Sequence, residues 1–236
     1  MKKLLLLSCL FLAICSRAQD VQRLNATYTP AEIIITDLNA DSQNDTISLY
    51  ELPAADGLGK FKKMNVSVNG RRMTFFAKDA WDGIDDSFAK ENNNAVKSKL
   101  AFVYKEKEQS FILLFGYPYP AAREEVFILC IKGRNMDIVF HNKIEEPLRM
   151  ADINNDGRAE LITQATPVFL STDAKGLTGS YSPYLVYSLS PAFGIDKTLT
   201  EKYNREYYVW AGMRYSDAIK VFYPNDGSKP KIIKTN

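Results

Sequence analysis

The chain has 236 residues but contains only one histidine, His141, and three cysteines. A Ser-His-Asp triad could use only that histidine, and a metal site built from several histidines is excluded. Hydrophobic residues make up 46% and charged residues 25% of the chain, a balance that excludes a disordered protein and a membrane-embedded one. With 12 glycines and 10 prolines, the chain is too poor in both to be collagen-like or of low complexity.

The first hydrophobic run is too short to be a transmembrane helix. Lys2 and Lys3 precede the apolar residues 4–15, and Ser16-Arg17-Ala18 places small residues at a signal-peptidase site. This pattern predicts a secretory signal peptide over residues 1–18. An alternative is a lipoprotein that is cut before Cys15, although such sites favour a small residue where this chain has Ile14.

Removing the leader also removes the basic excess. The 30 lysines and arginines become 27 against 28 acidic residues, so the mature net charge is close to −1. No nucleic-acid partner is therefore expected. Of the cysteines only Cys130 remains, inside an apolar run, which excludes an intramolecular disulfide. We expect it to be a small buried hydrophobic residue, because a catalytic thiol would need His141 nearby.

The mature chain reads as a series of strands rich in β-branched and aromatic residues, separated by turns. Asn69-Gly70 predicts a two-residue type I′ hairpin, since both positions must take positive φ. Runs 111–115 and 126–131 are apolar without alternation, which predicts strands buried on both faces. The expected strands cover residues 32–36, 45–50, 60–68, 71–77, 99–105, 110–116, 125–131, 135–140, 147–151, 159–164, 183–189, 218–223 and 230–234.

One helix of about 10–12 residues is expected near the C-terminus. Thr198 to Glu201 fits a capping box, and Leu199, Tyr203, Tyr207 and Trp210 follow at roughly helical spacing. A strand over residues 206–210 is the alternative. The fold class is thus all-β, either propeller-like or an irregular multi-sheet antiparallel assembly with one C-terminal helix, in a single domain over residues 19–236.

Two acidic loops share one spacing. The pattern D-x-N-x-D-x-x-x-[DE] occurs at residues 37–45 and again at residues 152–160. Side-chain oxygens stand at the first, third, fifth and ninth places, and the seventh residue can offer its carbonyl. Ca²⁺ takes six to eight such oxygens. Gly157 occupies the sixth place of the second loop, where a sharp positive-φ turn is needed, whereas Ser42 occupies it in the first.

The flanking residues exclude an EF-hand and a dockerin. The twelfth places hold Ser48 and Thr163 instead of the bidentate glutamate, and strand-like residues flank both loops. Residues 150–163 (MADINNDGRAELIT) closely resemble the FG-GAP and VCBS repeats of β-propeller proteins, and residues 36–50 resemble them more weakly. The resemblance implies structural Ca²⁺ held by Asp152, Asn154, Asp156, Arg158 (carbonyl) and Glu160, and by Asp37, Asn39, Asp41, Gln43 (carbonyl) and Asp45.

Weaker candidates lie elsewhere. Residues 79–97 are expected to form a long surface loop in which Trp81, Asp82, Asp85 and Asp86 could meet a ligand. His141 is expected to be an exposed turn residue. Tyrosine and tryptophan recur late in the chain, as core or interface residues, at Tyr181, Tyr184, Tyr187, Tyr203, Tyr207, Tyr208, Trp210 and Tyr215.

The resulting functional hypothesis is an exported, non-catalytic binding module, periplasmic or secreted, that recognises a protein or a glycan at the cell envelope. An inhibitor of a cell-wall hydrolase is a specific version of this hypothesis. The alternative is a carbohydrate-active hydrolase that uses loop carboxylates such as Asp82 and Asp85, which requires two acids converging in a cleft.

Overall fold

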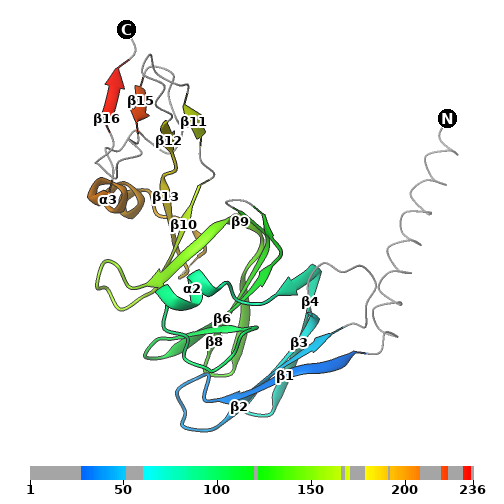
Figure 1. Ribbon diagram of the computed structural model, residues 1–236. Helices are drawn as coiled ribbons and strands as arrows, with labels where there is room; N and C mark the ends of the chain where they lie inside the picture. The colour runs from blue at the N-terminus through cyan, green and yellow to red at the C-terminus, as the bar shows by residue number, and fades with distance from the viewer. Residues whose placement is uncertain are drawn as a thin grey trace, which may run out of the picture.

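The all-β class is confirmed. The computed structural model describes residues 28–51, 61–119, 122–165, 168–170, 179–190, 192–207, 219–222 and 231–234 (Figure 1). Sixteen antiparallel strands and two helices lie in these ranges. The proposed leader falls outside them, as do Tyr208, Trp210 and Tyr215. No helix in the described part of the chain is long and apolar enough to cross a membrane.

The first part of the chain is a run of antiparallel hairpins. Asn69 and Gly70 both have positive φ (48° and 77°), so the predicted type I′ hairpin is confirmed. The elements here are β1 (Thr29–Thr36), β2 (Asp45–Glu51), β3 (Phe61–Val68), β4 (Arg71–Asp82), α2 (Asp86–Glu91), β5 (Phe102–Lys105), β6 (Gln109–Gly116), β7 (Pro118–Tyr119) and β8 (Ala122–Lys132).

The second part begins with the longest strand, β9 (Asn135–Ala151), and contains the predicted helix. The capping prediction was wrong in its position, because the carboxylate of Asp196 accepts the N–H of Leu199 at 2.8 Å and the helix already begins at Lys197. The remaining elements are β10 (Glu160–Gln164), β11 (Val168–Leu170), β12 (Gly179–Tyr181), β13 (Tyr184–Ser188), β14 (Gly194–Ile195), α3 (Lys197–Tyr207), β15 (Ile219–Phe222) and β16 (Lys231–Lys234).

The strands form one open antiparallel path in the order β1-β2-β3-β4-β6-β8-β9-β10-β13-β14, with β5 beside β6 and β7 beside β8. Strand β9 joins the two halves, because its first part pairs with β8 and its last part with β10. The pairs β11–β12 and β15–β16 lie beyond β13, far from β1 (Figure 1). Of the two expected architectures, this is the irregular multi-sheet antiparallel assembly.

Strands β6 and β8 separate two hydrophobic cores, as their uninterrupted apolar sequences predict. Ile112 and Leu114 face a first core with β1–β4, whereas Phe111 and Leu113 face a second core with β9, β10 and β13. All four side chains are at most 1% exposed. Because side chains alternate along a strand, two adjacent apolar strands supply both cores at once.

The expected surface loop over residues 79–97 was wrong. Strand β4 continues to Asp82, and α2 then packs Phe88 into the second core at 3% exposure. Asn92 is also buried, where its side chain donates to the carbonyl oxygens of Phe88 and Leu148 and accepts the N–H of Met150. A polar composition therefore concealed a short helix, and the buried asparagine that follows it satisfies neighbouring backbone groups.

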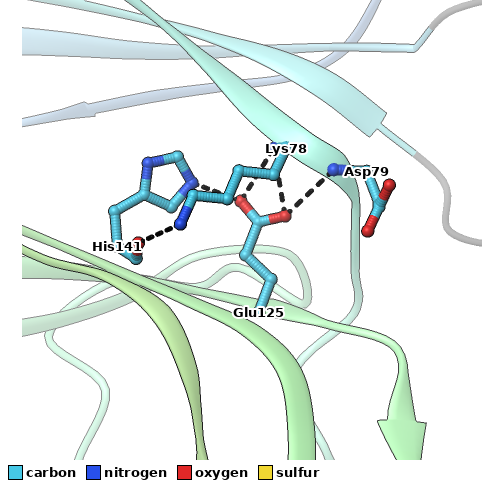
Figure 2. A network of polar contacts seen from close by, with 4 residues as sticks. All are labelled: Lys78, Asp79, Glu125 and His141. Carbon is cyan, nitrogen blue, oxygen red and sulfur yellow. Dashed lines mark hydrogen bonds and ion pairs between the residues drawn. The ribbon is translucent and has the colours of Figure 1, made fainter.

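The prediction for His141 was also wrong. This residue lies within β9, and its Nε2 is 2.5 Å from an oxygen of Glu125, which is only 2% exposed (Figure 2). The same carboxylate accepts the backbone N–H groups of Lys78 and Asp79 at 3.1–3.2 Å. Glu125 thus pairs with backbone amides of β4, which are donors that a buried carboxylate requires.

Gly116 allows the Glu125 backbone to come this close. A Cβ at Gly116 would lie 2.8 Å from the Cβ and 2.9 Å from the N of Glu125. We expect Gly116→Ala to lower the free energy of unfolding by about 1–3 kcal/mol, measured by urea denaturation. Gly194→Ala is the control, because nothing lies within 4 Å of its Cβ position. Equal stability of the two variants would contradict this account.

Cys130 is partly buried against the second core, and burial raises the pKa of its thiol to about 11. His141 pairs with Phe127, which faces the first core, so the imidazole and the thiol belong to opposite faces of the sheet.

We therefore expect alkylation of Cys130 at pH 8 to be on the order of a hundredfold slower in the folded protein than in urea. Peptide mass spectrometry can follow this residue separately. The folded rate should rise about tenfold per pH unit from pH 8 to pH 10, since thiolate accumulates below its pKa. Rapid labelling at pH 8 would contradict the raised pKa.

Candidate functional site

The two acidic loops occupy equivalent places in the fold. Residues 37–44 connect β1 to β2, and residues 152–159 connect β9 to β10, so each loop closes a pair of adjacent antiparallel strands. The first loop reaches the next turns along the sheet: the side chain of Asn39 donates to the carbonyl of Gly133 at 3.1 Å, and Asp45 accepts the N–H of Asn69. In the second loop, Ala159 donates to Glu106 at 2.7 Å.

The loops share six hydrogen bonds, place by place. The N–H groups of the fifth and sixth residues donate to the first-place carboxylate, at 3.3 and 2.9 Å in the first loop and 3.0 and 2.8 Å in the second. The fifth N–H also donates to the third-place amide oxygen, and the third-place amide nitrogen donates to the fifth-place carboxylate. The carboxylate of the fifth residue accepts the backbone N–H of the seventh residue. The carboxylate of the ninth residue accepts the backbone N–H of the second residue.

The backbone conformations also match. Positive φ occurs at the fourth place, in Ala40 (60°) and Asn155 (61°), and at the sixth place, in Ser42 (65°) and Gly157 (85°). The predicted positive-φ turn at the sixth place is confirmed in both loops, while the fourth-place turn has no glycine to signal it. Ala40 and Ser42 each adopt a conformation that costs L-residues roughly 1–2 kcal/mol, so the contacts of the first loop must outweigh this strain.

The charges of the second loop act on its ninth residue. Burial raises the pKa of Glu160. The hydrogen bond from the N–H of Ile153 lowers this pKa, whereas the nearby carboxylates of Asp156 and Asp152 raise it further. In the first loop, the N–H of Gln43 holds the pKa of the exposed Asp41 below its usual value. A cation near the second loop would favour the ionised form of Glu160.

The donor types suit a hard cation. Each loop offers carboxylate oxygens at three places, an amide oxygen at the third and a carbonyl at the seventh, and Ca²⁺ prefers oxygen ligands of these kinds. In the ranges that the structure describes, no three or more His, Cys, Asp or Glu side chains are grouped closely enough to hold a metal ion. The loop carboxylates accept backbone N–H groups with part of their acceptor capacity, and an ion would draw their remaining lone pairs closer together.

Two open cavities flank the second loop. One, of about 250 Å³, lies between Asp152 and helix α3 and is lined also by Arg149, Lys202 and Glu206. The other, of about 220 Å³, lies beside Gly157 and the turn between β5 and β6. Both cavities are lined mainly by charged side chains, and lysine and arginine side chains therefore lie close to the second acidic loop.

The residues in 79–97 that were expected to meet a ligand do not form one site, because they differ in burial and in their partners. Trp81 is fully buried in the first core, whereas Asp82 accepts the N–H of Gly83. Asp85 forms an ion pair at 3.3 Å with Arg123, a side chain that is 3% exposed and also contacts Glu146 at 3.1 Å.

Arg123 could not be predicted from the sequence, because its partners Asp85 and Glu146 lie far away along the chain. Burial raises the pKa of Glu146, against the lowering effect of Arg123. Among the tyrosines, Tyr187 packs in the second core with its hydroxyl on Glu145, and Tyr184 stacks edge-on against Tyr203. These described tyrosines thus have core or helix-packing roles.

Comparison of the chain with family models, with curated proteins and with solved structures finds no significant match. The assignment of a role therefore rests on the loops and surfaces themselves.

The sixth place provides a conformational test of the loop pair. Gly157→Ala should lower the free energy of unfolding by about 1 kcal/mol, because the new Cβ meets no atom within 4 Å and only the positive φ is penalised. Ser42→Gly should raise it by up to about 1 kcal/mol, since glycine relieves the strain. Both are measured by urea denaturation in a calcium chelator. Effects of the same sign would contradict the equivalence of the loops.

Proposed function

We propose that this chain is an exported, non-catalytic binding module of the cell envelope whose two acidic loops hold structural Ca²⁺. The observation that carries the proposal is the six hydrogen bonds and two positive-φ positions repeated in two loops 115 residues apart, since Asp37 and Asp152 occupy the same place. An ordinary solvated turn has no need to repeat such a conformation in full.

The ion would be held by the oxygens at five places of each loop. It would supply positive charge that offsets three carboxylates on one short loop, and this charge would tie together the two strands that the loop connects. The residues in these roles are Asp37, Asn39, Asp41, Gln43 and Asp45, and Asp152, Asn154, Asp156, Arg158 and Glu160.

The hydrolase alternative is less well supported. Asp85 is neutralised by the buried Arg123, and Trp81 points into the core rather than toward a substrate. The inhibitor of a cell-wall hydrolase stays within the binding-module proposal, and a pull-down from the cell envelope with the mature chain would distinguish it by recovering the hydrolase.

Calcium should stabilise the protein by linkage. With a dissociation constant near 1 mM, 10 mM Ca²⁺ contributes about 1.4 kcal/mol per site, which raises the melting midpoint by a few degrees relative to EGTA. Asp156→Ala and Asp156→Asn should both reduce this shift, although asparagine retains an oxygen for the N–H of Arg158. Glu91→Ala, at an exposed carboxylate on α2 outside the loops, should preserve it.

Calorimetric titration of the wild-type chain with CaCl₂ gives a second readout. An unchanged melting midpoint in EGTA and in Ca²⁺, together with no binding heat, would refute the calcium sites. Mg²⁺ serves as the ion control, because its stricter octahedral demand disfavours a loop of this kind.

A further inference from the structure

The outer face of β1–β4, opposite the first core, combines aromatic rings with cations. Tyr50, Lys63 and Phe76 face one another across three adjacent strands. The ammonium of Lys63 lies 5.0 Å from the ring centres of both Tyr50 and Tyr28, and Tyr28 also contacts the ring of Phe76 at 6.2 Å. All four side chains are partly exposed. The face therefore begins with an aromatic cluster around one positive charge.

Polar side chains continue the face along the strands. Ser48, Asn65 and Thr74 form the next row, in which the hydroxyl of Thr74 donates to Asn65 at 2.8 Å. Ser67 and the exposed Arg72 lie opposite each other in the row after that. Lys63 and Ser67 are four residues apart on β3, so the two cationic rows are separated by roughly 14 Å.

The edge of the same face is apolar. Ile33 is 59% and Ile35 is 65% exposed, and they pair with Ser48 and Thr46 on the face just described. In the rows that the structure describes, the charged members are Lys63 and Arg72, and none is a carboxylate. Positive charge at two separated points, with hydroxyl groups between them, complements an extended chain that carries repeated negative charges.

We infer that this outer face binds an acidic polysaccharide. The inference rests on the proposed function of a binding module and names its partner class. The aromatic rings and exposed isoleucines offer apolar surface for sugar C–H groups, and Lys63 and Arg72 pair with carboxylates. Ser48 and Thr74 offer partners for hydroxyls, while Asn65 is only 5% exposed and orients the hydroxyl of Thr74. A peptide would use the same cations but has no need of a row of hydroxyl groups.

Binding is measured by calorimetry or biolayer interferometry with the full chain and hyaluronan, whose uronic acid units alternate with uncharged amino sugars. We expect saturable binding that weakens with salt, and no binding to neutral dextran. Tyr50→Ala, Lys63→Gln and Arg72→Gln should each weaken binding by about threefold to tenfold. Lys90→Gln on α2 and Tyr117→Ala between β6 and β7 are matched controls and should bind as the wild type does.

Each other outcome is decisive. Equal affinity for poly-L-glutamate would overturn the glycan assignment in favour of a general anion site. Absence of binding to hyaluronan, or binding that the three variants leave unchanged, would overturn the surface itself. The titration is run in EGTA and in Ca²⁺, with folding checked by thermal melts. Binding of hyaluronan with the same melting midpoint in EGTA and in Ca²⁺ would refute the structural calcium sites and leave the glycan surface supported. A higher melting midpoint in Ca²⁺ without binding of hyaluronan would support the calcium sites and refute the glycan surface.

Discussion

The burial of β6 and β8 on both faces is the constraint on which the rest of the structure depends. Two apolar strands with no polar face must be covered twice, and the chain covers them with two different sets of strands. The N-terminal hairpins complete one core, and β9, β10 and β13 complete the other. The sheet then has to continue in both directions from its centre, and this places the two acidic loops in separate halves of the molecule.

Carboxylate groups that accept backbone N–H groups occur at three irregular places of this sheet, at Glu125 and in the two acidic loops. Glu125 accepts hydrogen bonds from two backbone N–H groups of β4, close to where β4 pairs with β6. The carboxylates at the first and ninth places of each acidic loop accept backbone N–H groups of the loop. Such charge-assisted bonds are stronger than neutral ones. These three places thus have charge-assisted hydrogen bonds in addition to the core contacts of Leu38 and Ala159.

The sequence predicted the features that depend on local periodicity. The strands, the Asn69-Gly70 hairpin, the doubly buried pair and the acidic loops all leave a signal within a few residues. What could not be predicted depends on partners far away in the chain: the pairing of His141 with Glu125, the ion pairs of Arg123, and the helix after Asp85 that Asn92 holds in place. The spacing of the candidate ligands was visible, but the positive φ at Ala40 had no sequence signal.

Strand β9 has an acidic loop in contact at each end. The turn that precedes it, at Gly133, accepts a hydrogen bond from Asn39 of the first loop, while its last residue, Ala151, leads directly into the second. A strand of 17 residues that pairs with β8 and then β10 transmits loss of order from one half of the molecule to the other. The two halves, which have separate cores, should therefore unfold as one cooperative unit, because neither can release β9 without exposing the core of the other.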